Sequence, residues 1–211
     1  MTERGMIFNG EMVRAILDGR KTQTRRPIKW KQTRFTEIGE REDGSKWPWS
    51  EDAEHACDFW HPCPFGAVGD RIWVRETWQA IHDYCDENGH VDERRYARSI
   101  PRHRGNYWHP VYEEAWGNES REDREFPWRP SIHMPRWASR ILLEITDVRV
   151  ERLRSMSQDD ARAEGVIAAS GPMEAGLAFR ELWDSIYGEE SWKANPWVWV
   201  ISFERVEGGA A

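Results

Sequence analysis

The longest stretch with a β pattern lies at 139–153 and reads SRILLEITDVRVERL. Its aliphatic residues alternate with polar ones, and successive side chains of a strand lie on opposite faces. The pattern therefore predicts a strand with one face on a hydrophobic core. Two further strands are predicted, at 71–78 (RIWVRETW) and at 195–206, the latter apolar on both faces at its start.

Helical patterns stand between these strands. Residues 10–18 have apolar side chains at helical spacing, and so do residues 175–186. Ser157 and Asp160 have the spacing of a capping box that begins another helix. The mixed order of helices and strands predicts a small α+β fold around a curved sheet, rather than an alternating parallel sheet.

The length of 211 residues suits a single domain, expected over 1–211. Residues 31–64 and 80–130 are irregular and are expected to be insertions. With 32% charged residues and no apolar run of about 18 residues, the chain is expected to be soluble and not to enter a membrane. Three cysteines and no secretory signal predict a cytoplasmic protein without disulfides, and the oligomeric state stays open.

The net charge of −7 excludes a generally basic nucleic-acid-binding protein, but the charge is unevenly distributed. Residues 19–36 contain seven basic residues and no acid. Such a segment either steers one anionic ligand or forms a solvated loop. The fourteen tryptophans belong either to the core or to platforms that stack on bases.

The basic segment begins GRKTQTRR, directly after the helix predicted over 10–18. Asn9 is a candidate N-cap of that helix, and Gly19 is a candidate stop. Lys21 and Thr24 are expected in the following loop, where a spacing of three lets them converge. A threonine hydroxyl needs a base to become a nucleophile. The lysine pKa of about 10.4 must fall by roughly three units, about 4 kcal/mol, before the amine serves as that base near neutrality.

Glu76 lies on the same face of the strand predicted at 71–78 as the aliphatic residues. A carboxylate that points inward needs a partner. A salt bridge to Lys21 would raise the lysine pKa and oppose its role as a base. Glu76 either orients a substrate or exchanges a proton with a leaving amine. The competing interpretation is a basic turn plus a buried Glu–Lys or Glu–Arg pair.

Two other groups of residues contain chemically active types. His55, Cys57, His61 and Cys63 lie within nine residues, but their spacing matches no common structural zinc pattern. No metal is therefore expected, and zinc binding by these residues is kept as the alternative. The segment SIHMPRW contains further candidates for binding phosphate or stacking on a base, with packing and turn geometry as the alternative. The candidate substrate-binding residues are Arg25, Arg26, Arg75, His133, Arg136 and Trp137.

Several segments resemble one known family. GRKTQTRR matches the G-x-K-x-x-T-x-R signature of the ASCH domain family, a branch of the PUA-like superfamily. VGDRIWVRETW resembles the second block of that family, whose glutamate corresponds to Glu76. HMPRWASRILLEITDV and NPWVWVISF are similar to prophage-encoded members. The resemblance covers both ends and the middle of the chain and leaves residues 30–60 and 80–127 poorly covered.

The resemblance implies a PUA-like small β-barrel with flanking helices and a cleft that takes RNA or a modified nucleoside. One branch of the family hydrolyses the acetyl amide of N4-acetylcytidine. By that likeness Thr24 is the nucleophile, Lys21 its base, and Glu76 the group that holds the amine or its leaving proton. No cofactor is implied.

Three functions therefore stay open. The first is hydrolysis of an N-acylated nucleobase or nucleoside. The second is non-catalytic binding of RNA or a modified nucleotide. The third is a role in phage morphogenesis or host interaction. The family branch that hydrolyses N4-acetylcytidine is more compact than this chain. The substrate of this chain can therefore differ from N4-acetylcytidine.

Overall fold

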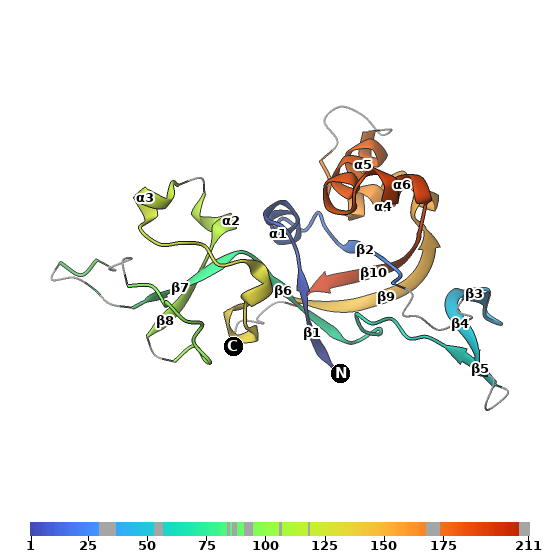
Figure 1. Cartoon of the computed structure of the whole chain (residues 1–211), viewed down its shortest axis with the longest axis horizontal. Coiled ribbons are helices and arrows are strands. Elements are labelled where there is room, and N and C mark those ends of the chain that lie inside the picture. The colour runs from blue at the N-terminus through green and yellow to red at the C-terminus, as the bar shows by residue number, and fades with distance from the viewer. Residues whose placement is uncertain are drawn as a thin grey trace. The chain divides into compact units, whose positions relative to one another are not determined.

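The computed structural model describes residues 1–29, 37–52, 57–83, 85, 88–90, 95–105, 107–117, 119–167 and 174–206. The chain is mixed α+β, which confirms the class expected from the sequence (Figure 1). Contacts divide it into two compact units. The first contains residues 1–2, 18–71 and 144–204, and the second contains residues 3–17, 72–143 and 205–211.

The first unit is built on three neighbouring strands in the order β9, β10, β2. Their bounds are Leu142–Arg152 for β9, Trp197–Arg205 for β10 and Gln23–Pro27 for β2. Strand β10 pairs antiparallel with β2. Residues 198–201 of β10 are all buried, which confirms a strand that is apolar on both faces.

Three helices complete the core of the first unit: α4 (Gln158–Ala163), α5 (Glu174–Tyr187) and α6 (Glu189–Ala194). Residues from α4, α5, β10 and the short 3-10 turn η3 (Leu153–Ser155) form one hydrophobic cluster. Its buried members are Leu153, Ala161, Ala175, Phe179, Trp183, Val198 and Val200.

The capping box predicted at the start of α4 is present. The Asp160 amide donates to Ser157 Oγ at 3.0 Å, and the Ser157 amide donates to Asp160 Oδ2 at 2.9 Å. These bonds satisfy backbone donors that the first turn of a helix leaves free. An isolated antiparallel β-bridge joins Lys21, just before β2, to Glu164, just after α4.

A separate three-stranded sheet lies within the range 31–64, which was expected to be an insertion. It contains β3 (Glu37–Glu40), β4 (Lys46–Asp52) and β5 (Cys57–Trp60). The guanidinium of Arg41 lies 4.1 Å from the ring centre of Trp47.

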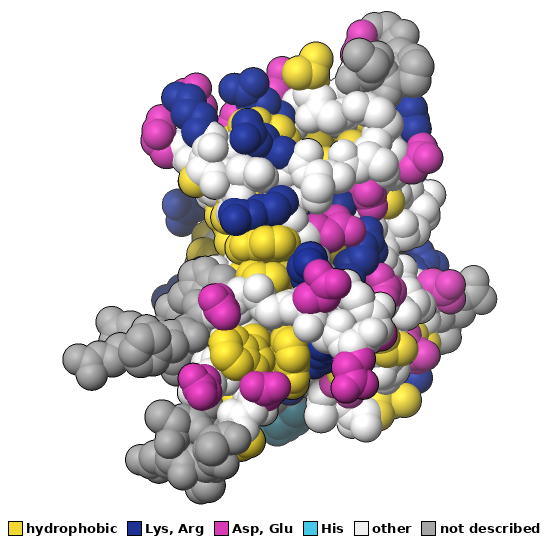
Figure 2. Space-filling model, turned by 90° about the vertical axis from the view of Figure 1, so that its right-hand side faces the viewer, with side chains coloured by type: hydrophobic (Ala, Val, Ile, Leu, Met, Phe, Trp, Pro, Cys, Tyr) yellow, Lys and Arg dark blue, Asp and Glu magenta, His cyan; other side chains and the backbone are white. Residues whose placement is uncertain are grey.

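One face of the molecule, drawn in Figure 2, has basic and acidic side chains intermingled rather than a patch of a single charge sign.

The second unit has β1 (Glu3–Ile7) beside β6 (Arg71–Arg75), whose last four residues belong to this unit. Helix α1 (Gly10–Leu17) is capped as predicted, because Asn9 Oδ1 accepts from the Met12 amide at 2.8 Å. No helix among the described residues combines the length and the apolar character needed to cross a membrane.

The rest of the second unit is a ribbon of β7 (Trp78–His82) and β8 (Trp108–Tyr112) with short helices around it. The helices are α2 (Glu113–Trp116), α3 (Arg121–Arg124), η1 (Ser131–His133) and η2 (Arg136–Ala138). Trp78, Ala80, Ala97, Met134 and Ala138 form its buried cluster. Ala80 and Ala97 of the range 80–130 thus pack with buried residues from outside that range, and a single domain over 1–211 stays a prediction.

Candidate functional site

The three predicted catalytic residues belong to both units. Lys21 and Thr24 lie in the first unit, and Glu76 lies in the second. The structure gives each of them a distinct set of contacts within its own unit.

Residues 21–26 do not form the loop that was expected after α1. Gly19 ends the helix as predicted, with a φ of +74°, but β2 begins at Gln23. Pairing with β10 supplies the backbone hydrogen bonds of this strand, with Ile201 opposite Thr24. This tertiary pairing overrides a local sequence that is polar and rich in arginine.

Lys21 is 2% exposed, and its ammonium group has three acceptors. Nζ donates to Glu164 Oε2 at 2.8 Å, to the Gln23 carbonyl at 2.8 Å and to the Glu164 carbonyl at 2.9 Å. An ammonium group has three donors, so these contacts satisfy its hydrogen-bonding capacity. In this arrangement the lysine is held as a buried cation.

Glu164 joins Lys21 to a second buried cation. Its Oε1 accepts from Arg25 Nη1 at 3.1 Å, and the side chains of Arg25 and Glu164 are 0% and 2% exposed. Arg25 Nη2 also lies 3.3 Å from Glu151 Oε2 and 3.4 Å from Asp160 Oδ1. The Glu164 carboxylate therefore compensates part of the charge of two cations, Lys21 and Arg25, that are buried away from solvent.

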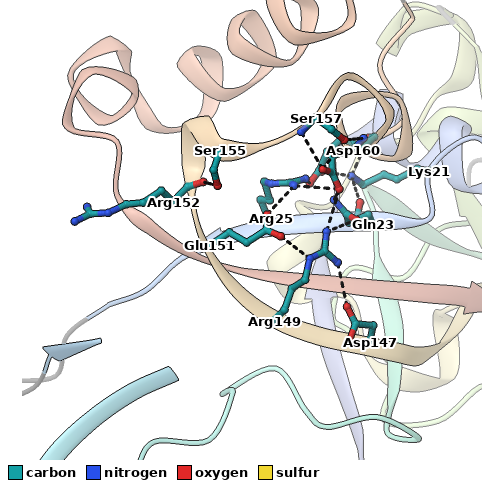
Figure 3. A network of polar contacts seen from close by, with 11 residues as sticks. Lys21, Gln23, Arg25, Asp147, Arg149, Glu151, Arg152, Ser155, Ser157 and Asp160 are labelled. Atoms are coloured by element: carbon teal, nitrogen blue, oxygen red, sulfur yellow. Dashed lines mark hydrogen bonds and ion pairs between the residues drawn. The ribbon is translucent and has the colours of Figure 1, made fainter. Parts of the chain in front are cut away.

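The network continues to the partly exposed Arg149 of β9. Its guanidinium contacts Glu151, Asp160 and Asp147 at 2.6, 3.0 and 3.0 Å. Figure 3 shows these side chains converging from β2, β9 and the start of α4. Charged groups from three segments distant in sequence thus fix β2 against β9 and α4. We call Lys21, Arg25, Arg149, Glu151, Asp160 and Glu164 the buried charge network.

Three pKa values in the buried charge network are displaced. Burial lowers the pKa of Arg149, but its bonds to Glu151 and Asp147 outweigh this effect and the net pKa is raised. Burial lowers the pKa of Lys21 below its ordinary value, against the opposing pull of Glu164, and the cations of Arg26 and Arg25 add to the lowering. Burial raises the pKa of Asp160, but hydrogen bonds from Ser157 outweigh it and the net pKa is lowered. Desolvation penalises a charge, whereas a hydrogen bond to the charged form favours it.

Thr24 is also 2% exposed. Alternation along β2 places its side chain on the face opposite to Gln23 and Arg25, which belong to the side of the buried charge network. Among the described residues its hydroxyl makes no side-chain hydrogen bond, and it is not one of the buried polar atoms that lack a partner. The strand that replaces the expected loop thus directs Lys21 and Thr24 to opposite faces.

Glu76 is 2% exposed and is held by Arg140. Arg140 Nε donates to Oε1 at 3.0 Å and Nη2 donates to Oε2 at 2.9 Å, a bidentate pair. Arg140 also contacts Glu114 at 2.9 Å and lies 4.2 Å from the ring centre of Tyr112. Burial raises the pKa of Glu76, and the bonds from Arg140 oppose the rise. The inward carboxylate thus has the partner that the strand pattern required.

Of the predicted substrate-binding residues, three are tied to neighbours in the second unit. Arg75 donates to the Met134 carbonyl at 3.2 and 3.1 Å. Arg136 pairs with Glu3 at 2.7 Å, and Trp137 Nε1 donates to the Pro101 carbonyl at 3.0 Å. These contacts fit the packing alternative for Arg75, Arg136 and Trp137. Arg26 is half-buried on β2, and His133 is exposed at the end of η1.

The structure describes three of the four His and Cys residues whose spacing was compared with zinc sites. His55 lies outside the described residues. Cys57 is exposed, Cys63 is buried, and His61 Nε2 lies 2.9 Å from Ser50 Oγ. Over the described ranges no group of His, Cys, Asp and Glu side chains is arranged to hold a metal ion.

Sequence reasoning missed Glu164 and Arg140, the partners of Lys21 and Glu76. Both are charged residues beside predicted elements: Arg140 near the start of a strand pattern, and Glu164 at the end of a short helix pattern.

Comparison of the chain with protein families, curated proteins and solved structures gave no match.

Proposed function

We propose that the protein hydrolyses the amide of an N-acylated nucleobase or nucleoside, with Thr24 as nucleophile and Lys21 as its base. The proposal includes the PUA-like barrel that the resemblance to the ASCH domain family implies, and the cytoplasmic location expected from the cysteine count. It is carried by one observation: a buried lysine with a lowered pKa lies three residues from a buried threonine. Because alternation along β2 directs the two side chains to opposite faces, the reaction requires residues 21–24 to rearrange so that Lys21 Nζ reaches the Thr24 hydroxyl.

The chemistry needs Lys21 as a neutral amine. In the resting arrangement all three of its donors are used, so one proton must leave, and Glu164 Oε2 at 2.8 Å is the nearest carboxylate acceptor described. Burial favours this transfer because a neutral pair costs less desolvation than two separated charges. We assign Glu164 the part of a positioning residue that sets the protonation of Lys21.

In the first step neutral Lys21 accepts the Thr24 proton as Oγ1 attacks the acyl carbon. The C–N bond then breaks, and the Lys21 ammonium returns that proton to the departing nucleobase amine. In the second step water attacks the acyl-threonine ester and gives a proton to Lys21. As the ester C–O bond breaks, the Lys21 ammonium passes that proton to Thr24 Oγ1. This step frees the carboxylic acid and restores the Thr24 hydroxyl and neutral Lys21, so that the sum is amide plus water to amine plus acid.

Glu76 is part of the proposed mechanism only because of the family resemblance, which gives it the role of holding the amine or its proton. Burial raises its pKa, which favours a protonated fraction able to donate to a leaving group. A Glu76→Gln variant tests that part separately from Thr24 and Lys21.

A second candidate function is binding of RNA or a modified nucleotide without turnover. It is favoured by the three acceptors around Lys21 Nζ, which suit a permanent cation better than a base. In that case removal of the Thr24 hydroxyl leaves ligand binding intact.

The deciding experiment incubates the full chain with a panel of N-acylated nucleosides and detects the deacylated products by mass spectrometry. Thr24→Ala should reduce turnover by roughly 10³-fold or more. Thr22→Ala is the matched control, because Thr22 is the exposed neighbour on the same segment. Full turnover by a folded Thr24→Ala protein refutes the nucleophile. Binding of these nucleosides with no turnover by the wild type favours the second candidate.

A further inference from the structure

We propose that residues 95–109 of the second unit form a binding surface for single-stranded nucleic acid, in which Arg98, Arg102 and Arg104 contact phosphates and Tyr107 stacks on a base. The proposal stands apart from the proposed hydrolysis, since none of its residues belongs to the buried charge network.

The segment has an unusual charge for this chain. Its sequence, RYARSIPRHRGNYWH, contains four arginines, two histidines and no acidic residue, in a protein with a net charge of −7. All four arginines are exposed. Basic residues interleaved with aromatic ones are the combination that contacts both the backbone and the bases of a single strand.

Arg98, Arg102 and Arg104 have no ion-pair partner among the described residues. Other arginines of the chain do have one, among them Arg14, Arg20, Arg25, Arg71, Arg136, Arg140, Arg149, Arg162 and Arg180. A paired guanidinium is largely neutralised, whereas an exposed unpaired one keeps its fork of donors for a phosphate. Three such groups within seven residues provide a short positive track.

Tyr107 supplies an aromatic platform beside this track. Its side chain is 62% exposed, and its ring lies parallel to that of His82, with centres 5.6 Å apart and planes at 7°. Trp108 meets the His82 ring edge-on at 5.1 Å. The Asp83 amide donates to the Tyr107 carbonyl at 2.8 Å, which fixes the residue at the end of the ribbon. A ring that is already stacked on one neighbour loses little conformational freedom when a base stacks on it.

The backbone that presents the arginines is anchored to strand β7. The Ala97 amide donates to the Ala80 carbonyl at 2.8 Å, and the His82 amide donates to the Arg95 carbonyl at 2.7 Å. Ala97 is buried in the cluster around Trp78. The exposed side chains therefore project from a framework that is held in place, as a binding surface requires.

A single strand suits these features better than a duplex. Stacking on Tyr107 needs a base whose face is free, and bases in a duplex are stacked on one another. RNA and DNA single strands share the phosphates and the base faces, so both are used as probes.

The experiment measures fluorescence anisotropy of the full chain with a labelled 12-nucleotide RNA, the matching DNA, and the DNA duplex. Three phosphate contacts predict a slope of about −2 for log affinity against log salt, or roughly 20-fold weaker binding at about 200 mM than at about 50 mM salt. Arg98→Gln/Arg102→Gln/Arg104→Gln should abolish most of this slope. Arg121→Gln/Arg154→Gln/Arg162→Gln is the matched control, because it removes three exposed arginines and the same charge elsewhere.

Tyr107→Ala should weaken binding by about 5- to 150-fold, and Tyr107→Phe should keep wild-type affinity because the ring remains. Thr24→Ala should bind like the wild type, so that a failure of the proposed hydrolysis and a failure of this surface are distinguishable. Equal losses in the two triple variants, or binding of the duplex alone, overturn the proposal. Absence of any binding at low salt overturns it as well.

Discussion

Replacement of Glu164 by glutamine should strongly destabilise the first unit. The carboxylate bonds Lys21 Nζ at 2.8 Å and Arg25 Nη1 at 3.1 Å, and the three side chains are at most 2% exposed. Glutamine keeps the size and one acceptor but removes the charge, which leaves Lys21 as a buried cation without its carboxylate and Arg25 with Glu151 and Asp160 as its remaining acidic partners. Removing one partner of a buried ion pair costs about 3–5 kcal/mol, because the remaining charge is uncompensated. We therefore expect a loss of that size in the free energy of unfolding.

Glu190→Gln is the matched control. Glu190 lies 3.0 Å from Lys193, but these side chains are 87% and 55% exposed. An exposed pair contributes about 0–1 kcal/mol, since water and salt screen it. The same chemical change at two sites thus separates the effect of burial from the effect of losing a carboxylate.

The assay is thermal unfolding at neutral pH, followed by far-UV circular dichroism. For a chain of this length each kcal/mol shifts Tm by about 2–4 °C, so Glu164→Gln should lower Tm by about 6–20 °C. Urea titration checks that the change is one of stability rather than of cooperativity. A shift no larger than that of Glu190→Gln refutes the view that Glu164 compensates two buried cations.

The pH dependence gives an independent check on the same residue. The folded pKa of Lys21 lies below the ordinary lysine value of 10.5, so between the two pKa values the unfolded chain binds more protons. Stability contributed by Lys21 therefore rises as pH increases through this window. Glu164→Gln removes the influence that raises the Lys21 pKa, so the window should extend to lower pH. An unchanged pH profile contradicts the coupling between the two residues.

Three further predictions concern the first unit. Phe179→Ala should cost about 3–5 kcal/mol in the unfolding free energy measured in urea, because Phe179 is buried in the cluster formed by α4, α5 and β10. Ser157→Ala removes the N-cap of α4 and should cost about 1 kcal/mol in the same titration. The pKa of Asp70 is lowered to about 2 by hydrogen bonds from Thr2, so wild-type stability should fall as pH drops from 3.8 toward 2, and Asp70→Asn should lack this component in an acid titration of Tm.

The elements set by local signals were predictable from the sequence. Alternation located the strands now seen at Arg71–Arg75, Leu142–Arg152 and Trp197–Arg205. The caps at Asn9 and Ser157 were equally clear, because a capping side chain and the amide it accepts from lie within three residues. Information of this kind is contained in one short window of sequence.

Features that depend on distant partners were not predictable. Strand β2 has no apolar alternation and exists because β10 pairs with it. Strand β8 pairs with β7 across about 25 residues of chain, and an α-helical turn, α2, follows it directly. Glu164 lies 143 positions from Lys21, and no local rule links the two. The sequence showed that Glu76 needed a partner, but not that the partner was Arg140.

The bridge between Lys21 and Glu164 has a consequence for synthesis of the protein. Strand β2 is synthesised before Glu164 and strand β10, which follow it by more than a hundred residues. A nascent chain that stops short of that glutamate holds Lys21 and Arg25 without the Glu164 carboxylate, and its strand β2 has no β10 beside it. The first unit therefore reaches its native packing late, and the segment around β2 is the part that a chaperone would have to protect until then.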